Sequence, residues 1–228
     1  MNKMNCEEFE VKPLLLSVPL VKESLRCLLH TILFSRSIGG DVPIEPESVK
    51  SEILGVSYCR ANQSGSGPDL GQIVENKLSD FIQKLETCES LILTLSFFLP
   101  RQGKRTLWDL LSQPFDDKAV FERWKIQVDL VDKSSATPIG KCLEAEEFRL
   151  IESAAVQTKE RVFYIIKRIN ERMDHLPAPP LEQSAYHFDI AFSASSGKSS
   201  YASSPASTSS IWSPKAIAQS IRSIPFIT

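Results

Sequence analysis

Cysteine and histidine are scarce in this chain, which limits the chemistry that the sequence can support. Its 228 residues include five cysteines, an odd number with no two close enough for a CxxC pair. A disulfide framework or a zinc site is therefore not expected, and the thiols are expected to be reduced. The three histidines fall in no metal-ligand spacing, and His30, near the apolar side of a predicted helix, is expected to be structural.

Glycine is also scarce, and the nine glycines form no nucleotide-binding loop. The segment Gly197–Ser199 matches the end of a phosphate-binding loop, but Phe192 stands where the first glycine of that motif belongs. No G-x-S-x-G sequence marks an esterase nucleophile. We therefore expect no catalytic residue, no cofactor and no metal.

An excess of charge and long apolar runs are both absent. Lys and Arg number 26 against 28 Asp and Glu, a net charge of −2, which disfavours a nucleic-acid partner. The longest apolar run, Leu91–Leu99, is far shorter than the roughly 20 residues that span a bilayer. The N-terminal residues lack the apolar run of a secretory signal. These features favour a cytoplasmic protein without a transmembrane anchor.

Apolar residues make up 42% of the chain and recur at helical spacing in three segments, 18–37, 69–87 and 141–175. In the first, Gly39 and Gly40 follow the last turn and end the helix. In the third, the residues expected to face the core are Phe148, Ile151, Ala155, Val162, Ile166, Ile169 and Met173.

Four shorter segments are predicted to be strands, at 52–60, 91–99, 121–131 and 186–192. The first, third and fourth alternate apolar and polar residues. The third, which contains Trp124, is expected to have one face exposed to solvent. The second is apolar throughout and is expected to be largely covered on both faces. Because these strands do not alternate regularly with the helices, the order favours an α+β fold with a mostly antiparallel sheet.

The domain organisation follows from a change in composition. Residues 1–192 contain all the predicted elements of the core, whereas 193–213 contain 11 serines in 21 residues and are expected to be a flexible linker. Residues 214–228 are expected to be a C-terminal tail, with a short helix that docks on the domain.

The connection between the second and third predicted strands is unusual for a surface loop. Trp108 and Phe115 lie in it, close to the basic residues Lys104 and Arg105. One interpretation is that the loop folds back and covers an end of the core. The other is an exposed aromatic anchor for a partner, since aromatic residues are enriched where interfaces are strongest.

Several blocks of the sequence resemble the autophagy-related protein 101 family. They are Ser24–Gly39, Phe121–Leu130, Arg161–Pro180 and Tyr186–Ile190. The resemblance runs in order over roughly residues 14–192. It implies a HORMA-like fold, which is a small antiparallel sheet with helices packed on one face and a C-terminal belt or tail.

The resemblance also implies a function. It indicates a non-enzymatic adaptor that binds and stabilises the HORMA domain of autophagy-related protein 13 in the autophagy-initiation kinase complex. It further implies a Trp-Phe finger that recruits downstream factors to the preautophagosomal structure, with Trp108 and Phe115 as candidates. The chain departs from the family in two places, because Gln113 stands where a Trp is expected and the Ser-rich tail does not resemble the usual belt.

Two other functions remain open at this level. One is another HORMA-type signalling adaptor, of a checkpoint or repair complex, although a belt that captures a peptide needs strand-forming residues and 193–213 is rich in serine. The other is a small cytosolic enzyme, which would need convergent ionisable groups in a pocket.

Overall fold

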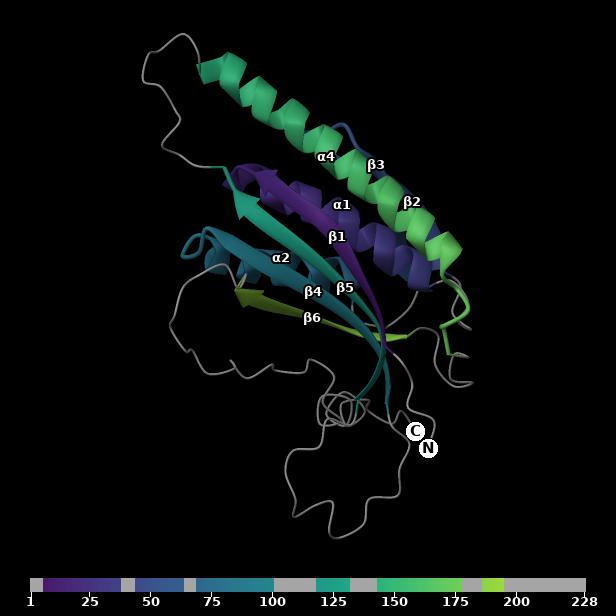
Figure 1. Ribbon diagram of the computed structural model, residues 1–228. Helices are drawn as coiled ribbons and strands as arrows, with labels where there is room; N and C mark the ends of the chain where they lie inside the picture. Colours follow the sequence, from purple (N-terminus) through teal and green to yellow (C-terminus); the bar gives the residue numbers. More distant parts are fainter. Residues whose placement is uncertain are drawn as a thin grey trace, which may run out of the picture. The chain divides into compact units, whose positions relative to one another are not determined.

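A mixed β-sheet lies at the centre of the computed structural model, and the described residues form it from four strands in the order β1-β5-β4-β6 (Figure 1). The strands are β1 (Glu7–Leu16), β4 (Ser90–Pro100), β5 (Lys118–Leu130) and β6 (His187–Ala194). β4 runs antiparallel to both β5 and β6, whereas β1 runs parallel to β5. The predicted α+β class, with a mostly antiparallel sheet, is confirmed.

The structure describes residues 6–37, 44–63, 69–100, 118–131, 143–177 and 186–194. They all belong to one unit, Met1–Ser195. The expected linker at 193–213 and tail at 214–228 lie outside the described residues, apart from Ser193 and Ala194, which end β6.

The helices are α1 (Val18–Ser37), α2 (Leu70–Leu85) and α4 (Leu143–Glu171), close to the predicted bounds. α1 and α2 lie on one face of the sheet, and α4 runs along β1 and contacts α1 (Figure 1). Asp69 starts α2 because its carboxylate accepts a hydrogen bond from the Gly71 backbone N–H at 2.9 Å. Arg26 of α1 makes a bidentate ion pair with Glu75 and so joins α1 to α2.

The core lies between the sheet and α1. The expected apolar face of α1 is confirmed, since its residues are at most 3% exposed: Val21, Leu25, Leu28, Leu29, Ile32 and Leu33. On β5, Trp124 is fully buried and its ring stacks on Phe9 with 4.3 Å between centroids. β4 alternates between buried residues and the half-buried Ile92, Thr94 and Ser96, and none of its residues from Leu91 to Leu99 is exposed, so the expectation that both its faces are largely covered is confirmed.

β1 was not predicted, although Phe9, Val11, Leu14 and Leu16 are all buried. A register shift between Val11 and Leu14 inserts an extra residue and breaks the period of two. Acidic residues also surround Phe9, which lowers the strand propensity of the segment. β1 is nevertheless a strand because its apolar side covers the core beside β5.

A second sheet pairs β2 (Ile44–Lys50) with β3 (Ser57–Gln63) against α1. β2 was not predicted and contains Pro46, which is compatible with an edge strand because the absence of its N–H need not cost a ladder hydrogen bond there. The predicted strand at 52–60 is wrong in its first half. Residues 51–56 form a turn in which Gly55 has a φ of 61°, and strand pairing begins only at Ser57.

Candidate interaction surface on helix α4

The side of α4 that faces the body of the domain is partly polar. Ala154, Thr158, Arg161, Ile165 and Ile169 are its buried residues, each at most 6% exposed. The Thr158 hydroxyl is 3.0 Å from the Ser24 hydroxyl on α1 and donates to its own helix at the Ala154 carbonyl. These bonds satisfy the buried hydroxyls and fix the rotation of α4 against α1.

α4 also closes the outer edge of β1. The side-chain amide of Gln157 accepts from the Leu15 N–H at 2.9 Å and donates to the Leu15 carbonyl at 3.0 Å, as a neighbouring strand would. Arg161 donates to the carbonyls of Lys12 and Pro13, each at 3.2 Å. An unpaired edge strand invites association with other chains, and α4 prevents it along this part of β1.

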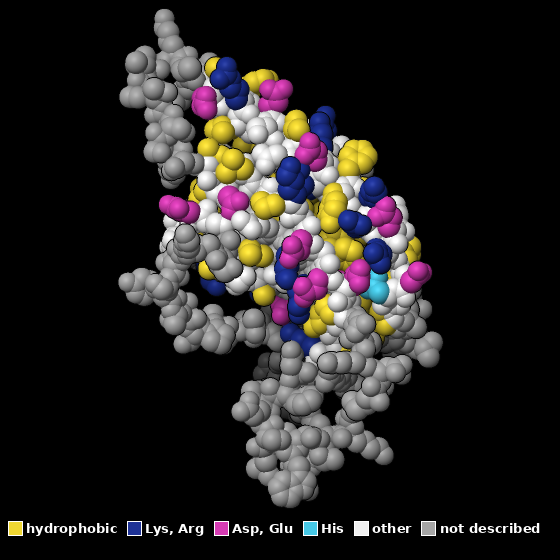
Figure 2. All heavy atoms as spheres, in the orientation of Figure 1, with side chains coloured by type: hydrophobic (Ala, Val, Ile, Leu, Met, Phe, Trp, Pro, Cys, Tyr) yellow, Lys and Arg dark blue, Asp and Glu magenta, His cyan; other side chains and the backbone are white. Residues whose placement is uncertain are grey.

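The opposite side of α4 is apolar and exposed. We call it the outer stripe and define it by Phe148, Val156, Phe163 and Ile166, which are 67, 51, 75 and 43% exposed. Hydrophobic side chains are visible along the length of α4, between charged ones (Figure 2). Single exposed apolar residues are common, but two phenylalanines and two aliphatic residues on one face of one helix indicate an interaction site.

The outer stripe corrects the expected core face of α4. Of the seven residues predicted to face the core, only Ile169 is buried, while Phe148, Ile166 and Met173 are exposed. The other three, Ile151, Ala155 and Val162, are half-buried at the border. The helix is rotated from the prediction because Thr158 and Arg161 occupy buried positions that the apolar pattern alone does not reveal.

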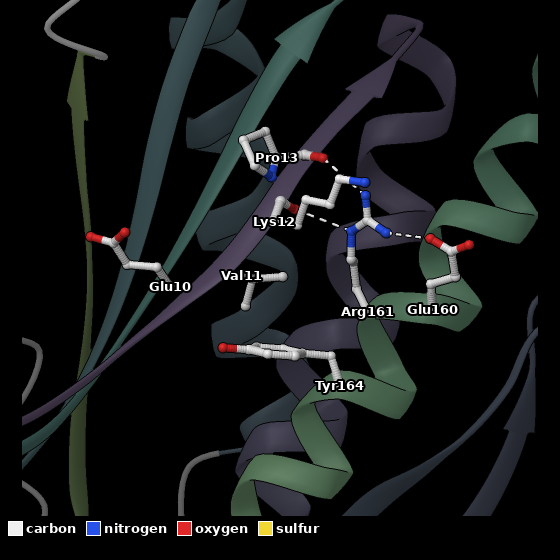
Figure 3. A pocket seen from close by; sticks show the side chains of 7 residues that line it. All are labelled: Glu10, Val11, Lys12, Pro13, Glu160, Arg161 and Tyr164. Atoms are coloured by element: carbon white, nitrogen blue, oxygen red, sulfur yellow. Dashed lines mark hydrogen bonds and ion pairs between the residues drawn. The ribbon is translucent and has the colours of Figure 1, made fainter.

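A cavity of about 480 Å³ lies between β1 and α4 (Figure 3). Glu10, Val11, Lys12, Pro13, Glu160, Arg161 and Tyr164 line it. The guanidinium of Arg161 already donates to two carbonyls and to Glu160, and the Tyr164 ring lies 5.3 Å from the guanidinium carbon of Arg168. Because Arg161 is committed to β1, the cavity marks the junction of strand and helix rather than a reaction centre.

A buried ionic cluster surrounds Glu122, whose side chain is fully buried on β5. Its carboxylate accepts from Arg36 at 2.9 Å and from the Trp124 indole at 2.5 Å, and it lies 2.7 Å from Nε2 of His175. The cluster joins the end of α1 to the segment after α4. With its oxygens fully occupied and no exposed surface, Glu122 is a structural anchor and not an accessible base.

His30 is buried on α1, as expected for a structural histidine, and its ring stacks on Tyr58 at 5.7 Å. Its buried Nδ1 has no hydrogen-bond partner, although a structural histidine usually has its ring nitrogens hydrogen-bonded. Burial, followed by the positive charge of Arg60, lowers the pKa of His30 to about 4. The ring is therefore neutral at physiological pH.

The two residues predicted for a partner-binding finger, Trp108 and Phe115, lie outside the described residues. What the structure describes is the pair of strands on either side. Pro100 at the end of β4 is paired with Lys118 at the start of β5, so the connection that contains both aromatics leaves and re-enters the sheet at adjacent positions.

No group of three or more His, Cys, Asp or Glu side chains among the described residues is placed to hold a metal ion. No helix within them has the length and apolar character needed to cross a bilayer.

Comparison with known proteins places the chain in a family. The family model for autophagy-related protein 101 matches residues 15–183, most of the chain. The chain belongs to the autophagy-related protein 101 family. It is 26% identical over 208 residues to autophagy-related protein 101 of Arabidopsis thaliana, an alignment that covers 85% of this chain and 90% of that relative. Membership in the family assigns the protein a role in autophagy.

The resemblance of the four sequence blocks to this family is thus confirmed, but the outer stripe was missed. A signal for it existed: the apolar residues of 143–171 cover more than half of the helix circumference, which is wider than one core-facing stripe requires. When the apolar surface of a helix is wider than the core can cover, the remaining part is available to contact a partner.

Proposed function

We propose that this protein is a non-enzymatic adaptor that binds and stabilises the HORMA domain of autophagy-related protein 13 within the autophagy-initiation kinase complex. Membership in the autophagy-related protein 101 family supports the pathway. The outer stripe of α4 supports binding to a protein domain, and it is the observation that carries the proposal. In this function the protein acts in the cytoplasm and is recruited to the preautophagosomal structure.

The outer stripe has the features of a binding surface. Phe148 and Phe163 each expose more than half of their surface, and a buried aromatic side chain contributes 150–250 Å² of contact area. α4 is held in place from behind by Gln157, Thr158 and Arg161, so the stripe is presented on a rigid element. A rigid apolar surface loses little conformational entropy when a partner docks.

Mixing the purified protein with the purified HORMA domain of autophagy-related protein 13 tests the proposal. We expect one peak in gel filtration at micromolar concentration and an interface on the order of 1,600 Å². In the double variant Phe148→Ala with Phe163→Ala, the dissociation constant measured by calorimetry should rise at least about thirtyfold, the factor that corresponds to the roughly 2 kcal/mol of a single central aromatic.

The control is Ile53→Ala. Ile53 is 48% exposed in the turn between β2 and β3, so this variant also removes an exposed aliphatic side chain, but from another element than α4. Its affinity should stay within about twofold of the parent, as for residues outside an interface. Two separate peaks for the mixed parent proteins, or equal losses in the control and the α4 variant, would contradict the proposal.

We also propose that Trp108 and Phe115 form the surface that recruits downstream factors. An aromatic side chain on a loop held at both ends by paired strands buries much apolar area at little entropic cost. In cells, Trp108→Ala with Phe115→Ala should leave the melting temperature and the heterodimer unchanged and yet reduce the recruitment of later autophagy factors. A large fall in melting temperature would instead favour a loop that covers the core.

A further inference from the structure

We infer that the outer stripe of α4 also binds a second copy of this chain, with the two α4 helices antiparallel about a two-fold axis. This inference goes beyond the proposed function and stands on the residues of α4 alone. The stripe contains one acidic and one basic residue among its apolar side chains, Glu152 and Lys159, and both are exposed. Their positions make the stripe complementary to itself.

The complementarity follows from the geometry of a two-fold axis. When two identical helices pack antiparallel, residues at equal distances on either side of one midpoint face each other across the interface. Glu152 and Lys159 lie at equal distances from the point between Ala155 and Val156, and so do Phe148 and Phe163. One axis through that point therefore sets each Glu152 against the partner's Lys159 and each Phe148 against the partner's Phe163.

These residues also lie on the same side of the helix. Seven residues separate Glu152 from Lys159, which is two turns with a drift of about 20°. Fifteen residues separate Phe148 from Phe163, so the apolar contacts lie about 22 Å apart and enclose the charged pairs. The same axis sets Val156 of the outer stripe against the partner's Ala155, and helices in such contacts lie about 8–10 Å apart.

The charges of the stripe favour this arrangement over a parallel one. A parallel pair in register would set Glu152 against Glu152 and Lys159 against Lys159, which is repulsive at both positions. The antiparallel pair makes two opposite-charge contacts instead. A single helix pair buries less than a standard interface of about 1,600 Å², so we expect a micromolar, reversible dimer.

Analytical ultracentrifugation of the full chain at a series of concentrations tests this inference. The parent should shift from monomer to dimer across the micromolar range. Glu152→Lys alone, or Lys159→Glu alone, replaces two attractive contacts by two repulsive ones and should weaken the dimer about tenfold or more at low salt. Glu152→Lys with Lys159→Glu restores opposite charges across the axis and should recover the parent's dissociation constant.

The double reversal is a sharp test because it keeps the composition and net charge of the chain. The side chains of Glu152 and Lys159 are exposed and two turns apart, so the melting temperature serves as a check that every variant is folded. A parent that stays monomeric at all concentrations, a dimer insensitive to the single reversals, or a double reversal that does not recover overturns the inference.

The same variants separate this inference from the proposed function. A heterodimer with an unaltered partner gains nothing from reversing both charges of this chain, so the double variant should recover homodimerisation without recovering any affinity lost for the HORMA domain of autophagy-related protein 13. Addition of that domain should dissociate the homodimer, because both would occupy the outer stripe. A homodimer that persists beside the heterodimer would mean that the two complexes use different surfaces, and the response to the charge reversals then shows whether the homodimer uses the outer stripe.

Discussion

Helices α1 and α4 pack against each other, yet their apolar residues serve different purposes. The apolar face predicted for α1 is buried against the sheet, with Leu25, Leu28 and Ile32 fully inaccessible. Of the seven residues predicted to form the apolar face of α4, only Ile169 is buried, and the neighbouring Phe163 is 75% exposed. The contrast shows that helical periodicity identifies an apolar stripe but does not say whether the domain itself or a partner covers it.

The two helices differ in what holds them. α1 is held by apolar burial, since its position between the sheet and β3 covers its apolar side completely. α4 is held on its inner side by hydrogen bonds from Gln157, Thr158 and Arg161 as well as by Ile165 and Ile169. This mixed attachment leaves the larger apolar side chains of α4 available on the other side.

The largest effect is expected in α1. Leu28→Ala removes a fully buried side chain and leaves a cavity, and it should lower the free energy of unfolding by about 2–5 kcal/mol. Urea denaturation of the parent and the variant measures this difference. A loss below about 1 kcal/mol would show that α1 is not the core helix.

The next effect is a pH dependence that also originates in α1. The pKa of His30 is about 4 in the folded protein and near 6.5 when unfolded, so below pH 6.5 the unfolded chain binds more protons. The free energy of unfolding should therefore fall by about 2 kcal/mol from pH 7 to pH 5. In His30→Gln this slope should be much smaller. An unchanged slope would assign the titration to His187, whose pKa is also lowered by burial, because Glu8 and Glu75, whose pKa values are lowered, titrate below this window.

A smaller effect is expected on the inner side of α4. Arg161→Ala leaves the carbonyls of Lys12 and Pro13 without their donor and should cost about 1–2 kcal/mol, less than the core truncation because water reaches part of this edge. Hydrogen exchange should then be faster in β1 than in β4. Uniform exchange in both strands would indicate that Arg161 does not hold the edge.

The smallest effect is expected on the outer stripe. Phe163→Ala removes a side chain that is 75% exposed, so the free energy of unfolding should change by less than about 0.5 kcal/mol. Thermal denaturation beside Leu28→Ala measures the contrast directly. A destabilisation comparable to that of Leu28→Ala would mean that Phe163 is part of the core and would remove the candidate surface.

Several elements were predictable from local patterns alone. α1, α2 and β4 lie within two residues of their predicted bounds, because each combines a clear apolar period with a definite stop, such as the glycines after α1. β1 and β2 were not predictable in this way. β1 contains a bulge that breaks its period, and β2 contains Pro46, which only an edge position allows.

The candidate site also has a part that was predictable from the sequence and a part that was not. The sequence blocks were sufficient to recognise the family, and Trp108 and Phe115 stay a prediction, since they lie outside the described residues. The outer stripe was read as core because Phe148 and Ile166 have the spacing of a buried face. Nothing in that spacing reports Thr158 and Arg161, which are buried only because Ser24 and the edge of β1 supply their partners.

The sequence by itself determined where the helices and most strands form, because those depend on apolar period, capping residues and breakers that act within a few residues. Only the tertiary structure decided that residues 7–16 form a strand, that Glu122 is a buried anchor, and which side of α4 faces outward. These outcomes depend on partners distant in the chain: β5 for β1, Arg36 and His175 for Glu122, and Leu15 for Gln157. A buried polar group is stable only where it has hydrogen-bond partners, and local sequence patterns do not show which distant residues supply them.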